Sequence, residues 1–240
     1  MSLKPVLRRS VPDDVFDQIV DDVLNGDFAP GEPLPSERQL ADVLGVSRPA
    51  VREALQRLSH AGYVSVRHGE STTVLDVRRL GGLDLLPRLL LRAGSIDLSV
   101  ARSMIEARRQ IGPIVARLAA ERGGARLTQA LSASIDELCA TTDPVAAQRA
   151  ALAFWDVVVD GAESIAFRLM FNSLRAAYEP TIDALSALMS AEVSQREAFV
   201  ALADAIAAGD ADGARDAAAA LLEPATAALL AAIAAIEVGA

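Results

Sequence analysis

Arg48 and Arg52 are two cationic side chains that lie four residues apart in the stretch SRPAVREALQRL, residues 47–58. Side chains at positions i and i+4 share one face of a helix, so both guanidinium groups are predicted to project together. A guanidinium can donate two parallel hydrogen bonds to a planar acceptor pair such as O6 and N7 of guanine. The alternative is a solvated surface pair, with Arg52 bonded to Glu53 or a neighbouring acid.

Three predicted helices and a hairpin position these arginines. Ser36 and Ser47 are predicted N-caps, and Gly45 closes the shorter helix between them. Runs rich in β-branched residues on either side of a glycine-containing break predict the hairpin. The predicted elements are helices over residues 12–25, 37–44 and 48–61 and strands over residues 63–67 and 72–75. Helix, helix-turn-helix and hairpin in this order are typical of a winged helix-turn-helix domain, whose second motif helix enters the DNA major groove.

The rest of the chain has no strand signal. Apolar residues recur at helical spacing in segments 85–93, 98–122, 127–140, 144–160, 163–189, 191–208 and 213–236. The predicted fold class is therefore mainly α: an N-terminal winged helix-turn-helix with three helices and a small β-hairpin, then an all-α bundle of about six or seven helices. The expected boundaries are 1–76 for the winged domain, 77–84 for a linker and 85–240 for the helical domain.

The distribution of charge favours a local basic face over a generally basic protein. The chain has 23 Lys+Arg against 32 Asp+Glu, for a net charge of −9, which argues against a generic binder of polyanions. Within residues 34–68 the sign reverses, because five arginines there face only three acids. Those arginines are Arg38, Arg48, Arg52, Arg57 and Arg67.

Cysteine usage and hydropathy indicate a cytoplasmic protein that is not inserted in a membrane. The one cysteine, Cys139, cannot form an internal disulfide and fits a reducing compartment. No signal segment opens the chain. The most apolar stretch, residues 217–236, is mostly alanine with Glu223 and Pro224 inside it, so a buried helix is predicted there.

The run LPSERQLADVLGVSRPAVREALQRLSHAGYVSVRHG resembles the DNA-binding domain of the GntR family of bacterial transcription regulators. The elements P-S-E-R, G-V-S-R and V-R-E-A-L occur in order at the family's spacing, and the resemblance covers residues 12–76. It implies a homodimer that binds a short palindromic DNA operator, with Arg38, Arg48 and Arg52 matching the DNA-contacting arginines. The expected DNA-binding residues are Arg38, Ser47, Arg48, Arg52, His68, Gly69 and Thr72.

The predicted wing resembles that of the FadR subgroup. This chain has His68-Gly69-Glu70-Ser71-Thr72-Thr73-Val74 where the subgroup has H-G-K-x-T-x-V. The resemblance implies that His68 and Gly69 enter the minor groove, whereas the alternative for His68 is a histidine on a surface turn. Glu70 departs from the subgroup's lysine and would repel phosphate groups.

The helical segment resembles the FadR-type effector domain over residues 85–225. Many relatives hold a divalent metal there with one Asp and three His, but the corresponding positions are Ala151, Trp155, Phe199 and Leu221. None of these side chains can ligate a metal, and both histidines of the chain lie in the winged domain. We therefore expect no metal and no cofactor.

Large apolar residues at the former metal positions leave two options: they fill the space as core, or they line a chamber for an apolar ligand. The layout of residues 164–178 is similar to that of acyl-CoA-binding members of the subgroup. This implies a fatty-acid or acyl-CoA effector, with arginines for the phosphates. The expected effector-binding residues are Arg108, Trp155, Asn172, Tyr178, Phe199 and Leu221. The alternatives are a small carboxylate or sugar acid, or a filled domain without a ligand.

Catalysis is not expected. The chain has no G-x-S-x-G elbow, no Walker loop and no histidine base outside the winged domain. The sequence thus predicts a ligand-responsive, DNA-binding regulator, with fatty acid metabolism as the implied context.

Overall fold

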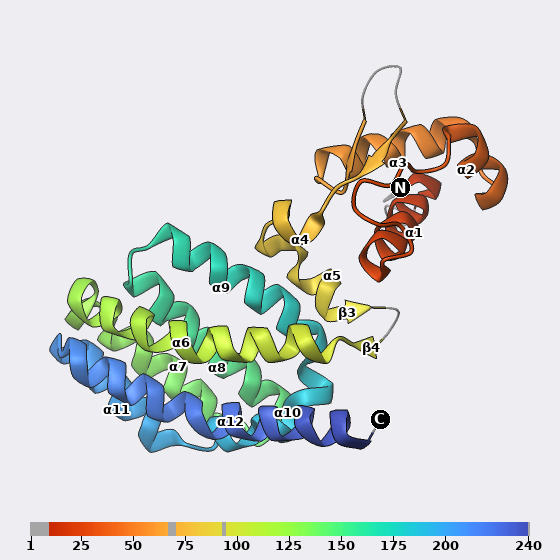
Figure 1. Cartoon of the computed structure of the whole chain (residues 1–240). Coiled ribbons are helices and arrows are strands. Elements are labelled where there is room, and N and C mark those ends of the chain that lie inside the picture. The colour runs from red at the N-terminus through yellow and green to blue at the C-terminus, as the bar shows by residue number, and fades with distance from the viewer. Residues whose placement is uncertain (1–9, 67–70, 93–94, 240) are drawn as a thin grey trace, which may run out of the picture. The chain divides into compact units, whose positions relative to one another are not determined.

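The computed structural model describes residues 10–66, 71–92 and 95–239, and the chain forms two compact units (Figure 1). The first unit extends to Leu85 and includes Arg92–Ser95, and the second contains Leu86–Leu91 and the residues from Ile96 onward. The segment expected to be a linker, residues 77–84, contains the short helix α4 (Val77–Leu80) and part of the 3-10 helix Leu83–Leu85.

The first unit is a winged helix-turn-helix, as predicted. Its elements are α1 (Val11–Asn25), α2 (Glu37–Leu44), α3 (Arg48–His60), β1 (Val64–Ser65) and β2 (Thr73–Val74). The Ser36 hydroxyl accepts from the backbone N–H of Gln39, whose side chain reaches back to the backbone of Ser36. Gly45 ends α2 with a φ of 67°, a left-handed conformation that favours glycine, and Ser47 caps α3 two residues later.

The wing is a short antiparallel pair in which Val64 lies opposite Val74. Both strands are shorter than predicted, with two residues each. The loop after α1 extends this sheet, because the Leu34 N–H donates to the Thr72 carbonyl over 2.8 Å. α3 is held by the buried side chains of Val51, Ala54, Leu55 and Leu58, so its opposite face is left exposed.

The second unit is an all-helical bundle, and the predicted fold class is confirmed. Over the described residues it has seven long helices, preceded by the short α5 (Leu86–Leu90). The strands β3 (Leu91–Arg92) and β4 (Ser95–Ile96) each have one residue in either unit. The long helices are α6 (Leu98–Arg122), α7 (Thr128–Ala140), α8 (Pro144–Gly161), α9 (Ile165–Tyr178), α10 (Ile182–Val193), α11 (Arg196–Ala208) and α12 (Ala211–Gly239).

Two details of the predicted helices were wrong. Residues 163–189 were expected to form one helix, but α9 and α10 are separated by the 3-10 helix Glu179–Thr181. Pro180 lies in that turn and has no backbone N–H to continue the α-helical bonding. Residues 85–92 form the end of the 3-10 helix Leu83–Leu85, the five-residue α5 and the strand β3.

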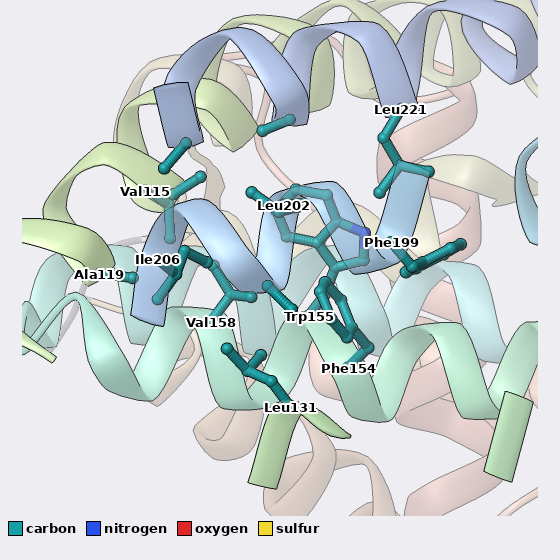
Figure 2. Close-up of a cluster of buried hydrophobic side chains, with 14 of the residues drawn as sticks. Val115, Ala119, Leu131, Phe154, Trp155, Val158, Phe199, Leu202, Ile206 and Leu221 are labelled. Atoms are coloured by element: carbon teal, nitrogen blue, oxygen red, sulfur yellow. The ribbon is translucent and has the colours of Figure 1, made fainter. Parts of the chain in front are cut away.

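The core of the bundle is centred on aromatic and branched side chains from α6, α7, α8, α11 and α12 (Figure 2). Phe154 and Phe199 are fully buried, and their rings meet edge to face with centroids 5.0 Å apart. α12 is long and apolar enough by composition to cross a membrane. Its residues Ala218, Leu221 and Leu222 are nevertheless buried in this core, which fits a core helix of the bundle.

Candidate functional site

The first candidate site is the exposed surface formed by Arg38, Arg48 and Arg52, here called the arginine face. All three side chains are exposed, Arg38 on α2 and the other two on the first turns of α3. Ser47 is also exposed, and its hydroxyl accepts from the backbone N–H of Ala50. The buried stripe of α3 turns Arg48 and Arg52 toward the exposed side of this helix.

Glu37 is an acidic member of this surface that the sequence analysis did not single out. Arg52 donates from Nε to Glu37 Oε1 over 3.0 Å and from a terminal nitrogen to Oε2 over 2.7 Å. The hydrogen bond from Arg52 is the main reason that the pKa of Glu37 lies below its usual value, and the charges of Arg52 and Arg48 act in the same direction. The two arginines therefore converge near one carboxylate.

The wing residues are only partly described. Thr72 is half-buried, and its carbonyl accepts from Leu34 in the sheet. His68 and Gly69 lie outside the described residues, so their expected role in the minor groove stays a prediction.

The second candidate site is a partly open cavity of about 270 Å³ in the helical unit, here called the central cavity. Its lining on α6 is a single stripe at helical spacing: Leu98, Ala101, Met104, Ile105, Arg108, Ile111, Gly112 and Val115. From Leu98 to Val115 is 17 residues, or about 25 Å of helix at ~1.5 Å per residue. α8, α9, α10 and α12 supply the other walls, which are almost entirely apolar. The cavity is therefore elongated.

Gly112 helps to shape this cavity. A Cβ atom at this position would lie 2.5 Å from Leu222 Cδ1 on α12 and 3.6 Å from the indole of Trp155. The next residue, Pro113, removes one backbone N–H from the interior of α6. The missing side chain lets α12 approach α6 closely beside Trp155.

A small polar cluster interrupts the apolar lining. Arg108 donates to both carboxylate oxygens of Glu192, with the longer contact at 2.6 Å, and Glu192 is 1% exposed. Tyr178 donates from its hydroxyl to Gln148 Oε1 over 2.9 Å. Burial is the main reason that the pKa of Tyr178 is raised to about 12, so this phenol remains a donor at neutral pH.

The structure separates the six residues expected to bind an effector. Arg108, Trp155 and Tyr178 line the central cavity together. Phe199 and Leu221 do not line it, because both are fully buried in the neighbouring core. For these two residues the structure therefore selects packing, one of the two options that the sequence left open. Asn172 is exposed on α9 and does not line the cavity either.

Two lining residues, Gln148 and Glu192, were missed by sequence reasoning. A signal for both was present: Gln148 shares a helical stripe with Ala151, Trp155 and Val159, and Glu192 shares one with Leu185, Leu188 and Met189. A polar residue on an otherwise apolar stripe is a candidate for burial with a partner. Among the described residues, no cluster of His, Cys, Asp and Glu side chains suits a metal ion.

Comparison with known families gives both units a counterpart. Residues 12–74 match the family described as bacterial regulatory proteins, gntR family, and residues 103–224 match the FCD domain. The transcriptional regulator Mce2R of Mycobacterium tuberculosis is 57% identical over 231 residues, which is 96% of this chain and 96% of that protein. The chain belongs to the GntR family. This GntR protein, with its FCD effector domain, is of the FadR type, and it is a transcription regulator and not an enzyme.

Two more distant proteins also resemble this GntR regulator, the first over part of its length. The fatty acid metabolism regulator protein of Vibrio cholerae is 37% identical over 101 residues, which is 42% of this chain and 36% of that protein. The solved structure of Lar, which controls expression of the Listeria monocytogenes agr system, is 19% identical. That similarity covers 94% of this chain and 99% of Lar with a TM-score of 0.57, and it supports the fold alone.

Proposed function

We propose that this GntR regulator binds a palindromic DNA operator as a cytoplasmic homodimer, and that a fatty-acid or acyl-CoA type ligand in the central cavity controls its affinity for DNA. In this proposal residues 1–76 bind DNA through the arginine face and the wing, and residues 85–240 bind the effector and form the dimer. The observation that carries the ligand class is the elongated, almost wholly apolar lining of the central cavity. The Vibrio relative's name supports the same class of ligand.

The apolar chain of the ligand is better supported than the phosphates of coenzyme A. The arginines expected to serve those phosphates are Arg102, Arg108, Arg109, Arg168 and Arg175. Four of them are paired with carboxylates: Arg102 with Glu237, Arg108 with Glu192, Arg168 with Asp156 and Asp160, and Arg175 with Glu179. The fifth, Arg109, does not line the cavity. A small carboxylate or sugar acid is disfavoured because, unlike a fatty acid, it has no long apolar chain to bury against this lining. Its charge would also meet an arginine whose own charge is already balanced.

In this proposal the binding of ligand and the binding of DNA are thermodynamically coupled. If the ligand binds best to a form that holds two winged domains at the wrong separation for the operator, DNA affinity falls by the same factor as DNA lowers ligand affinity. Operator half-sites have a set spacing, so the separation of the domains is the quantity that must change.

Affinity for saturated acyl chains is expected to rise with chain length up to a limit. Each methylene that enters the cavity contributes roughly 0.8 kcal/mol, or about fourfold in Kd. Trp155 lines the cavity and is the only tryptophan of the chain, so titrations can follow its fluorescence directly. A flat response to chain length would contradict the proposed ligand class.

Ala232→Leu is expected to lower the longest chain length that binds well, because Ala232 lines the cavity on α12. Ala235→Leu is the matched control, since Ala235 is exposed on the same helix and does not line the cavity. An equal effect of both variants would mean that the chain does not reach α12.

Glu37→Gln is expected to raise affinity for nonspecific DNA by roughly two- to fivefold at low salt and to reduce discrimination for the operator. The change removes a negative charge beside the arginine face and releases Arg52 from its bidentate partner. Glu53→Gln, an equal change of charge at an exposed position of α3, is the control. Fluorescence anisotropy with operator and scrambled duplexes measures both effects, and an identical response of the two variants would contradict a specific role for Glu37.

A further inference from the structure

Arg92 is bonded to the end of a helix that lies far from it in the chain. Its Nε donates to Asn25 Oδ1 over 3.3 Å, and one terminal nitrogen donates to the same oxygen over 3.1 Å and to the carbonyl of Leu24. Leu24 and Asn25 are the last two residues of α1. The final carbonyls of a helix have no partner within the helix and carry a partial negative charge, so a guanidinium stabilises them. Arg92 therefore caps the C-terminal end of α1.

The residues on both sides of Arg92 belong to the wall of the central cavity. Leu90 and Ile96 line the cavity, and Leu90 is 5% exposed. The Asp97 N–H donates to the Leu90 carbonyl over 2.8 Å, which holds the two wall residues together at the start of α6. The chain passes from the second unit to the first at Arg92 and returns to the second unit at Ile96. Arg92 is thus joined to both wall residues by a short length of backbone.

The packing of the winged unit makes α3 follow α1. Arg57 on α3 donates to Asp13 on α1 over 2.5 Å, and its guanidinium lies 5.0 Å from the centre of the Phe16 ring. Phe16 also meets Tyr63, just before β1, edge to face with ring centroids 6.2 Å apart. A close-packed interior transmits a displacement instead of absorbing it. A change in the position of α1 therefore carries the arginines of α3 with it.

We propose that Arg92 transmits the state of the central cavity to the winged unit, as a positioning residue that does not itself line the cavity. A ligand that fills the cavity displaces Leu90 and Ile96, and the backbone that joins them to Arg92 draws its guanidinium away from the end of α1. Effector and DNA can be coupled only through an element whose position both of them bias, and this contact is that element. The inference rests on the proposed function, because it requires a ligand whose binding changes DNA affinity.

Arg92→Met tests this role, because methionine keeps an unbranched apolar side chain and has no donor for α1. The full chain is titrated with hexadecanoate and with hexadecanoyl-CoA. Trp155 fluorescence reports binding of the probe, and the anisotropy of a labelled operator duplex, selected from a randomised pool, reports binding of DNA. In the unchanged protein a bound probe is expected to lower operator affinity by roughly 5- to 150-fold, the usual range of coupling between two sites.

In Arg92→Met the probe is expected to lower operator affinity by less than about threefold. The probe itself is expected to bind at least as tightly as to the unchanged protein, because the contact that it must displace is gone. Arg78→Met is the matched control, an identical change at an exposed position of α4. This control is expected to keep the full effect of the probe on operator affinity.

Asn25→Ala breaks the same contact from the side of α1 and decides the question even if Arg92→Met does not fold. The Leu24 carbonyl remains in this variant, so the effect of the probe on operator affinity is expected to fall less than in Arg92→Met. The double variant Arg92→Met/Asn25→Ala is expected to match Arg92→Met alone, because both changes remove one shared contact.

An effect of the probe that survives in full in Arg92→Met and in Asn25→Ala would overturn the role of Arg92 and leave the proposed function standing. Loss of probe binding in Arg92→Met would also overturn it, since Arg92 would then act on the cavity and not on its coupling to DNA. If neither probe changed the operator affinity of the unchanged protein, the proposed function itself would be wrong, and the role of Arg92 with it.

Discussion

Arg108→Met is expected to lower the free energy of unfolding of the helical unit by about 3–5 kcal/mol. The variant leaves the carboxylate of Glu192, which is 1% exposed, without the guanidinium that donates to both of its oxygens. Urea unfolding followed by the fluorescence of Trp155 measures the loss, because the only tryptophan of the chain lies in this unit.

Two further variants control this experiment. Glu192→Leu is expected to cost less, since the side chain of Arg108 is 30% exposed and its charge can reach water. The double variant Arg108→Met/Glu192→Leu removes both charges together and is expected to recover most of the loss. A loss below about 1 kcal/mol for Arg108→Met would show that Glu192 is not held as a buried ion pair.

Arg48→Ala and Arg52→Ala are each expected to weaken operator binding by roughly 5- to 150-fold while changing the affinity for scrambled DNA much less. Both side chains are exposed on the face of α3 that is turned away from its buried stripe, and both lie near Glu37. Arg52 must release Glu37 before it can bind a base. The Arg52→Ala variant is therefore expected to lose less operator affinity than Arg48→Ala. Anisotropy titrations with operator and scrambled duplexes at several salt concentrations measure the difference.

Arg38→Ala is expected to behave differently from both. Arg38 is expected to contact a phosphate, so its removal would weaken binding to all DNA by a similar factor. The slope of log affinity against log salt concentration would fall by about one, because one fewer counterion is released on binding. Arg149→Ala, an exposed change of equal charge on α8, controls for net charge. Operator binding that is unchanged by Arg48→Ala would show that the recognition face of α3 lies elsewhere.

The winged unit was the part of the fold that local patterns specified most fully. The N-caps Ser36 and Ser47 and the left-handed glycine Gly45 interact only with backbone groups a few residues away. The local amino-acid sequence was therefore enough to predict where the two helices around the turn begin and end. The i, i+4 spacing of Arg48 and Arg52 also placed both on one face. The ion pair with Glu37 joins two helices across 15 positions of the chain, and the sequence did not reveal it.

The helical unit shows the limit of such patterns. Periodicity identified apolar stripes on its helices, but a stripe does not reveal whether its members meet a neighbouring side chain or an empty space. Phe199 and Trp155 were equivalent candidates by type, and only the packing of α11 and α8 made the first one core and the second one cavity wall.

Composition and local order by themselves predicted a mainly helical chain with outward arginines, and the resemblance to the GntR family predicted a regulator, because capping and helical periodicity depend on residue type and short spacing. The tertiary structure alone decided that an apolar cavity remains, that Glu192 neutralises Arg108, and that two buried donors of α8 have no acceptor among the described residues. Those features arise where helices distant in sequence meet, and the volume left between them depends on all of their side chains at once.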